Sequence, residues 1–281
     1  MANPLEKTAA QPTTFETAKR NFDAITKKFD TRRPTLDEFS VEKGGPYPAA
    51  EVASDRAWIT RKKKQIFIQG ARGDNAEMEE RRLYAEYVFM EMVDSGELFD
   101  NDMVEVMPSS EFDDLANGAD AVVTFCDDDG NVEFAFSVDV KAALTAESEN
   151  VEKVERLVRE KIYSGVGSSV KYFIHENVET GEVSRRAMAV PNFVIWVEPE
   201  TIQSLMLALA KKEKDKTAED EKLISRETKK LYQSMMAQCE KALKILAGVN
   251  EKNGLQSDPK IAKTRLPYQD LIEKIREYVG R

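Results

Sequence analysis

The amino-acid sequence predicts an α/β (α+β) protein, in which a mixed sheet is flanked by helices and a helical region follows at the C-terminal end. Two observations predict this class. Along residues 132–142, apolar side chains share one face of a strand and mostly polar side chains share the other. Residues 75–93 and 221–247 instead carry apolar side chains at helical spacing. The chain therefore contains both strands and amphipathic helices, which must pack on each other.

The N-terminal 70 residues are expected to form an irregular extension, because they hold half of the ten prolines and show little periodicity. A short helix is predicted over residues 15–29. Irregular structure should continue through residues 44–46, and a strand is predicted over residues 65–68.

Residues 71–199 are predicted to form the core domain. A helix over 75–93 and a strand over 103–107 precede a hairpin, whose turn is Asp127-Asp128-Asp129-Gly130-Asn131. The elements expected after the hairpin are a helix over 151–163, a strand over 170–175, further sheet over 186–190 and a strand over 192–197.

Residues 200–281 are predicted to be a helical C-terminal region, with helices over 201–211, 221–247 and 267–278. Their long apolar stripes favour packing on the core together with a contribution to a homodimer. An intramolecular helical cap is the alternative.

Composition indicates a globular protein, with 41% hydrophobic and 33% charged residues among 281. The longest apolar run, residues 205–210, is too short to span a bilayer, and the N-terminus lacks the pattern of an export signal. We therefore expect a cytoplasmic protein with no membrane partner. The net charge of −10 argues against a protein that coats nucleic acid, but it does not exclude an enzyme with a local basic surface.

Few residues are available for thiol or imidazole chemistry. Cys126 and Cys239 form no CxxC pair, and they cannot build a zinc site alone. His175 is the one histidine of the chain, so histidine-based metal cages and Ser-His-Asp catalysis are nearly excluded. Carboxylates and lysines must carry any catalysis.

The predicted hairpin gathers side chains that suit a hard metal ion. Asp139 and Lys141 share one face of a strand because a step of two residues keeps the face, and the turn brings Asp120 near them. Such a group can hold a divalent cation and the water that it activates. The alternative is a half-solvated hairpin whose charges pair across strands, each pair contributing roughly 0.2–1 kcal/mol.

The acidic turn of the hairpin does not fit a calcium-binding loop. Placing Gly130 at the sixth position of that loop puts Phe125 first and Phe136 twelfth, where oxygen ligands are needed.

The order of helix, strand, hairpin with Asp then Asp-x-Lys, helix and strand resembles the αβββαβ core of the PD-(D/E)XK, or restriction endonuclease-like, nuclease superfamily. The resemblance covers roughly residues 75–176. The family's first acidic motif is matched by Asp120, and its second by Asp139-Val140-Lys141. Ala119 replaces the proline of the family's name, and the helical tail carries no subfamily signature that we recognise.

The resemblance implies a metal-dependent nuclease that hydrolyses phosphodiester bonds, with DNA as the expected partner and RNA left open. Mg²⁺ or Mn²⁺ would be held by Asp120, Asp139 and the Val140 carbonyl. Many members add a glutamate from the preceding helix, matched first by Glu79 and second by Glu86. Lys141 would orient or activate the attacking water. A protein that uses this fold for binding or scaffolding, without hydrolysis, is the alternative.

Overall fold

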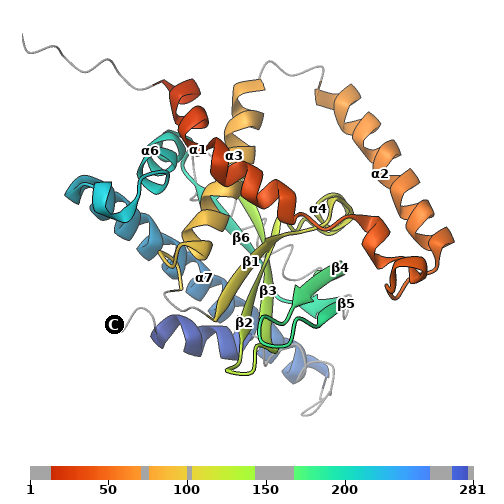
Figure 1. Cartoon of the computed structure of the whole chain (residues 1–281). Helices are drawn as coiled ribbons and strands as arrows, with labels where there is room; N and C mark the ends of the chain where they lie inside the picture. Colours follow the sequence, from red (N-terminus) through yellow and green to blue (C-terminus); the bar gives the residue numbers. More distant parts are fainter. Residues whose placement is uncertain (1–13, 71–75, 100–102, 143–167, 254–267, 278–281) are drawn as a thin grey trace, which may run out of the picture.

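A four-stranded mixed sheet lies at the centre of the molecule (Figure 1). The structure is a computed structural model, and it describes residues 14–70, 76–99, 103–142, 168–253 and 268–277. The strand order is β1 (Val104–Pro108), β2 (Ala121–Cys126), β3 (Val132–Ala142) and β6 (Asn192–Val197). The first three strands pair antiparallel in sequence order, and β6 runs parallel to β3. The mixed sheet flanked by helices is thereby confirmed.

Helices cover one face of this sheet (Figure 1). Phe136, Val138 and Val140 of β3 point to that face, since alternate side chains of a strand share a side. Their core also includes side chains from an N-terminal helix, a central helix and the C-terminal helices. These elements are α1 (Phe15–Arg32), α3 (Ala76–Asp94), α6 (Pro199–Leu209), α7 (Ala218–Asn253) and a helix over residues 268–277.

A separate hairpin covers part of the other face. It consists of β4 (Ser168–Glu176) and β5 (Val183–Val190), which pair with each other in a two-stranded sheet. Val170 and Phe173 of β4 form a small buried cluster with Val122 and Ala135 of the main sheet. The hairpin is therefore anchored to the sheet by apolar contact.

The predicted strand over residues 170–175 forms, but its expected place as the last strand of the core is wrong. It pairs with β5, and β6 takes the place beside β3. The side chains of β5 are mostly exposed or half-buried, as suits a peripheral hairpin. β6 is largely buried on both faces, which is typical of a parallel strand inside a sheet. The helix predicted over residues 151–163 lies outside the described residues.

The N-terminal region is largely helical, where irregular structure was expected. The predicted strand over residues 65–68 is wrong, because these residues end α2 (Ala49–Gly70). The alanine, arginine and lysine residues before them favour a continuing helix over a strand. Ile66, Phe67 and Ile68 are exposed on that helix.

The predicted helices of the tail are confirmed in α6, α7 and residues 268–277. Their apolar stripes face the same core as the sheet and α1, so one core crosses both predicted domain boundaries. The tail residues of this core include Leu205, Met206, Met235, Leu246 and Leu271. The homodimer stays a prediction. Within the described ranges, no helix combines the length and apolar character needed to cross a membrane.

Candidate functional site

Three of the predicted site residues meet where β2 begins and β3 nears its end. Asp120 directly precedes β2, and its backbone N–H donates to the Val138 carbonyl at 2.7 Å. Because Ala121 pairs with Val138, the antiparallel register sets Asp120 opposite Asp139. Lys141 forms an ion pair with Asp139. The structure thus brings Asp120, Asp139 and Lys141 together, as the hairpin pattern predicts; their chemical roles stay predictions.

Backbone groups fix the Asp120 carboxylate. Asp120 is 2% exposed, and its Oδ2 accepts a hydrogen bond from the Val140 N–H at 2.6 Å. The Val140 residue of the Asp-x-Lys motif therefore holds Asp120 through its amide. Its carbonyl as a metal ligand remains an expectation from the resemblance.

A short helix that the sequence analysis missed adds a fourth acidic residue. This helix is α4 (Glu111–Asn117), whose N-cap is Ser110. The carboxyl group of Asp114 on α4 interacts with that of Asp120. A serine followed by acidic residues is an N-terminal capping signal that could have revealed α4. Gly118 ends it with a φ of 59°, in the left-handed region that glycine adopts without strain.

The central helix α3 contributes Glu86 to the same cluster. Its charge interacts with those of Asp120 and Asp114. Glu79, the first choice from the sequence, belongs to α3, but its side chain lies outside the described part of the structure. The two glutamates are seven residues apart, so they share a helix face while standing roughly 10 Å apart along the axis. Helical spacing alone could not choose between them.

The cluster is electrostatically unfavourable for its own carboxylates. Burial raises the pKa of Asp120 to about 7, and the nearby charges of Asp139 and Asp114 add to the effect. Lys141 and the Val140 N–H act in the opposite direction. Asp120 is thus partly protonated at neutral pH, where an exposed aspartate is ionised.

Glu86 and Asp114 show the same behaviour. Burial raises the pKa of Glu86 to about 9, helped by the charges of Asp120 and Asp114. Burial also raises the pKa of Asp114, although the Arg33 and Arg82 guanidinium groups oppose the rise. The raised pKa values of these buried acids show that the site favours added positive charge, which a proton or a metal cation can supply.

Two arginines border the acidic cluster. Arg33 follows α1, and its Nη1 lies 3.9 Å from Asp114 Oδ2 and donates to the Ser109 carbonyl at 3.3 Å. Arg82 lies on α3, one turn before Glu86, and its charge acts on both Glu86 and Asp114. With Lys141, the site combines four carboxyl groups with three cations.

The donor set fits a hard divalent cation. Asp139 Oδ1 is buried and accepts no hydrogen bond among the described residues, although Lys141 forms an ion pair with it. Carboxylate oxygens are the ligands that Mg²⁺ and Mn²⁺ prefer. Asp120, Asp139, Asp114 and Glu86 could supply them, and a cation among these groups would relieve the repulsion between neighbouring carboxylates.

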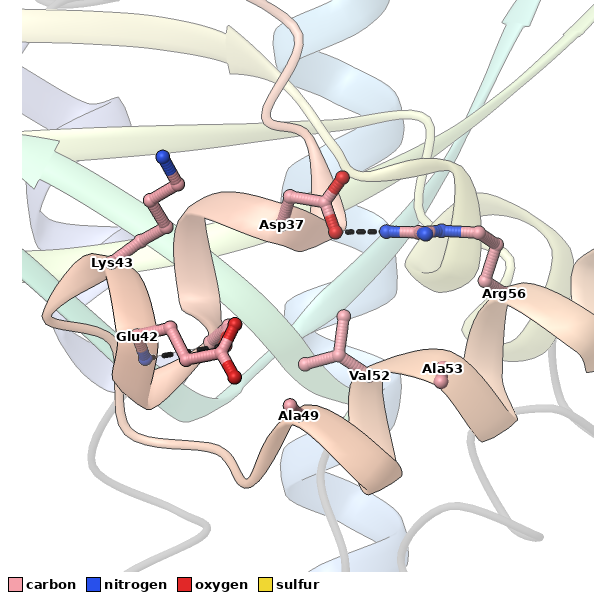
Figure 2. Close-up of a pocket in the computed structure, with 8 residues that line it drawn as sticks. Asp37, Glu42, Lys43, Ala49, Val52, Ala53 and Arg56 are labelled. Atoms are coloured by element: carbon pink, nitrogen blue, oxygen red, sulfur yellow. Dashed lines mark hydrogen bonds and ion pairs between the residues drawn. The ribbon is translucent and has the colours of Figure 1, made fainter.

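Other features of the molecule fit catalysis less well. Burial raises the pKa of the Cys126 thiol to about 11 and that of Cys239 to about 12, so neither is a thiolate nucleophile at neutral pH. A pocket of about 310 Å³ lies between the start of α2 and the two short 3-10 helices, Leu36–Phe39 and Val41–Lys43 (Figure 2). Its Asp37 and Arg56 are already ion-paired, and the acidic cluster does not line it.

Comparisons of the chain with protein-family models, with curated proteins and with solved structures found no match. The chemistry of the acidic cluster is therefore the basis for assigning a function.

Proposed function

We propose that the protein is a metal-dependent nuclease that hydrolyses phosphodiester bonds in DNA. The observation that carries the proposal is the pairing of Asp120 with Asp139 across the hairpin, beside Lys141 and in a buried cluster of carboxyl groups. A purely structural hairpin would gain little from a buried acidic cluster in which the pKa values of Asp120, Asp114 and Glu86 are raised. A phosphodiesterase site needs such a cluster to hold cations against a phosphate.

Mg²⁺ or Mn²⁺ would be held by Asp120, Asp139 and Glu86, with Glu86 replacing Glu79 as the first choice on the helix. Such a cation supplies Lewis-acid chemistry: it lowers the pKa of a bound water and offsets charge on the phosphate oxygens. The chain itself supplies the orientation. The Val140 N–H holds the Asp120 carboxylate, and the β2–β3 register holds Asp139 opposite it.

The cations of the site have a role in the proposed reaction. Lys141 is suited to orient the attacking water and to stabilise negative charge that develops on the phosphate. Arg33 and Arg82 border the acids and would attract a phosphodiester that is otherwise repelled by a protein of net charge −10. Arginine is well suited to this contact, because its planar guanidinium can donate two parallel hydrogen bonds to phosphate oxygens.

The proposal includes a restriction endonuclease-like core in which β6 is the last strand. The described order is then α3, β1, β2 and β3, followed after the hairpin β4–β5 by β6, which runs parallel to β3. This order keeps the helix, the three antiparallel strands and the final strand of the αβββαβ pattern. The first acidic motif directly precedes β2, and the second lies on β3.

The test is cleavage of plasmid DNA, single-stranded DNA and RNA by the full chain with Mg²⁺ or Mn²⁺. We expect cleavage of DNA that stops when the cations are chelated. Asp139→Asn should lower the rate at least about 100-fold, because it removes a ligand charge needed in the transition state. Glu86→Gln should lower it at least about tenfold, and more than Glu79→Gln does.

Glu133→Gln is the matched control. Glu133 lies on β3, as Asp139 does, but its side chain is 58% exposed and outside the cluster. It should leave the rate unchanged. A preparation that binds DNA but cleaves none of the three substrates, with either metal, would support the binding or scaffold alternative. Cleavage that survives Asp139→Asn would point to a contaminating nuclease and contradict the proposal.

A further inference from the structure

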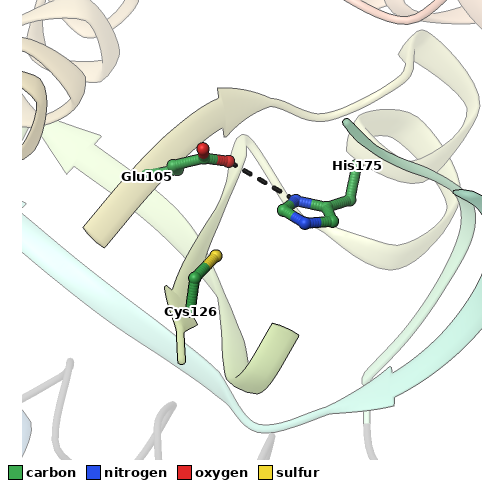
Figure 3. Close-up of side chains that lie close together, drawn as sticks. All are labelled: Glu105, Cys126 and His175. Atoms are coloured by element: carbon green, nitrogen blue, oxygen red, sulfur yellow. Dashed lines mark ion pairs between the residues drawn. The ribbon is translucent and has the colours of Figure 1, made fainter. Parts of the chain in front are cut away.

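A second group of side chains with ligating atoms converges at the turn end of the β2–β3 hairpin, away from the acidic cluster (Figure 3). Glu105 lies on β1, Cys126 ends β2 and His175 lies on β4. The thiol sulfur, a carboxylate oxygen and an imidazole nitrogen all lie within 4.8 Å of one another. Three elements that are distant in sequence therefore direct one sulfur, one oxygen and one nitrogen at a common point.

The imidazole of His175 is held in the orientation of a metal ligand. Its Nε2 lies 3.0 Å from the Gly130 carbonyl oxygen, which can only accept a hydrogen bond. Nε2 therefore carries a hydrogen, and in the neutral ring Nδ1 keeps a free lone pair. Nδ1 faces Glu105 (Figure 3). A backbone carbonyl bound to the distal nitrogen is a common way to orient a ligating histidine.

An ion pair between His175 and Glu105 accounts poorly for this arrangement. Nδ1 and Glu105 Oε2 are 3.4 Å apart, whereas charge-assisted N–H···O bonds measure about 2.7–2.9 Å. The His175 side chain is also buried, at 6% exposure, so the ring is held in place by the surrounding chain. The spacing is instead close to that of two ligand atoms bound to one tetrahedral metal ion, about 3.3 Å.

We propose that Glu105, Cys126 and His175 form a binding site for a borderline divalent transition metal of the Zn²⁺ class. Sulfur, nitrogen and carboxylate ligands together select Zn²⁺ over Mg²⁺. With bonds of about 2.0–2.3 Å, tetrahedral ligands stand roughly 3.3–3.8 Å apart. Side-chain rotations that shorten the widest gap by about 1 Å are therefore sufficient to close the site.

The three residues leave one coordination position open, because no further histidine, cysteine or acid joins the group within the described ranges. Water or a small anion would complete it. The site is separate from the acidic cluster, since Asp120 precedes β2 and Cys126 ends it, roughly 20 Å away at the rise of a strand. A bound cation would tie β4 to β1 and β2, and so lock the peripheral hairpin onto the main sheet.

The test is titration of the full chain with Co²⁺, after treatment with a chelator, followed by absorption spectroscopy. We expect one equivalent to bind with a thiolate-to-Co²⁺ charge-transfer band in the near ultraviolet. Cys126→Ser should abolish the band, and the matched control Cys239→Ser should keep it. Zn²⁺ should displace Co²⁺, whereas excess Mg²⁺ should not. Asp120→Asn should leave the band intact.

Thermal melting gives a second readout. Zn²⁺ should raise the Tm of the wild type and of Cys239→Ser, because it binds the folded state alone. His175→Gln keeps a donor for the Gly130 carbonyl but has no imidazole lone pair, so Zn²⁺ should raise its Tm less than that of the wild type. Glu105→Gln, at a partly exposed position, should weaken Co²⁺ binding at least about tenfold. A folded wild type without the band, or a band that survives Cys126→Ser, would overturn the proposal.

Discussion

At the residue scale, Asp120 links the folding of the chain to its proposed chemistry. The same carboxyl group is buried, is held by a backbone amide, and lies beside two further acids. A protein that kept this arrangement for stability alone would be more stable with an amide at that position. The loss of stability caused by ionising Asp120 can therefore be measured, and it would indicate a site that is built to hold a cation.

The stability of the protein without divalent cations should fall as the pH rises. The pKa of Asp120 is about 7 in the folded state and 3.8 as the ordinary value, so between these pH values the folded state binds more protons than the unfolded state. Stability then decreases with pH, by a few kcal/mol in total. Asp120→Asn should weaken this dependence, to which the raised pKa values of Glu86 and Asp114 also contribute, and should be more stable than wild type above about pH 7. Urea unfolding at several pH values measures both profiles.

Glu133→Gln provides the comparison, because it changes an exposed carboxylate on the same hairpin. Millimolar Mg²⁺ should restore the wild type at high pH and leave Asp120→Asn unaffected. If the free energy of unfolding changed with pH in the same way for wild type and Asp120→Asn, ionisation of Asp120 would not destabilise the folded state, and the prediction would be wrong.

Glu86 and Asp114 are the two residues of the cluster whose positions could not be predicted from the sequence. Asp120, Asp139 and Lys141 could be placed together because a single hairpin contains all three. Asp114 reaches the cluster through α4, which is too short to show a periodic pattern. Glu86 and Glu79 differ only in their height along α3, and that height depends on how the helix packs against the sheet.

At the element scale, α4 acts as a bridge between the main sheet and the β4–β5 hairpin. Asp113 of α4 is fully buried and accepts hydrogen bonds from the backbone N–H groups of Lys171 and Tyr172, at 2.7 and 2.9 Å. Ser110 and Asn117 also donate to it. Through these contacts, α4 holds Asp114 against the cluster.

Asp113→Ala should therefore destabilise the protein by about 3 kcal/mol or more, because it leaves the buried N–H of Tyr172 and the half-buried N–H of Lys171 without an acceptor. Asp113→Asn should cost less, since the amide oxygen keeps one acceptor. Asp128→Ala, at an exposed turn position, should change stability by less than about 0.5 kcal/mol. Chemical denaturation compares the three variants. Equal losses for Asp113→Ala and Asp128→Ala would refute the bridging role.

The helices and strands also differ in how well the local sequence pattern predicted them. β3, β6 and α7 carry strong patterns of their own and were predicted closely. The end of α2 has the composition of a strand, yet it continues a helix that starts sixteen residues earlier, at Ala49. The partner of β3 could not be chosen between β4 and β6, because pairing across a long connection depends on which strand can bury both faces.

At the scale of the whole molecule, the C-terminal helices complete the main core. Phe193 of β6 contacts Tyr268 edge to face, with ring centroids 6.0 Å apart, and Phe99 contacts Tyr232 in the same way at 5.5 Å. A chain that ends at Val197 should lose cooperative thermal unfolding and aggregate, because it exposes this apolar surface. The full chain should melt in one transition.

Calorimetry and light scattering of both chains measure this outcome. A shortened chain that melts sharply as a monodisperse species would show that the tail is a separate unit. Light scattering of the full chain also tests whether the protein is a homodimer. A monomeric mass at micromolar concentration would favour the alternative, in which the tail is an intramolecular helical cap. The protein would then have no paired active site for cutting both strands of a duplex.

The parallel pairing of β3 with β6 has a consequence for how the protein folds. Ser137 pairs with Asn192 across a connection that holds the whole β4–β5 hairpin, whereas β1, β2 and β3 pair with near neighbours. Closing that long loop costs entropy before its contacts form, so high contact order should make β6 the slow step. The β2–β3 hairpin that carries the acidic residues would then form early, while the edge of β3 that later pairs with β6 is still open. Nascent chains would be vulnerable to edge-to-edge aggregation until β6 docks.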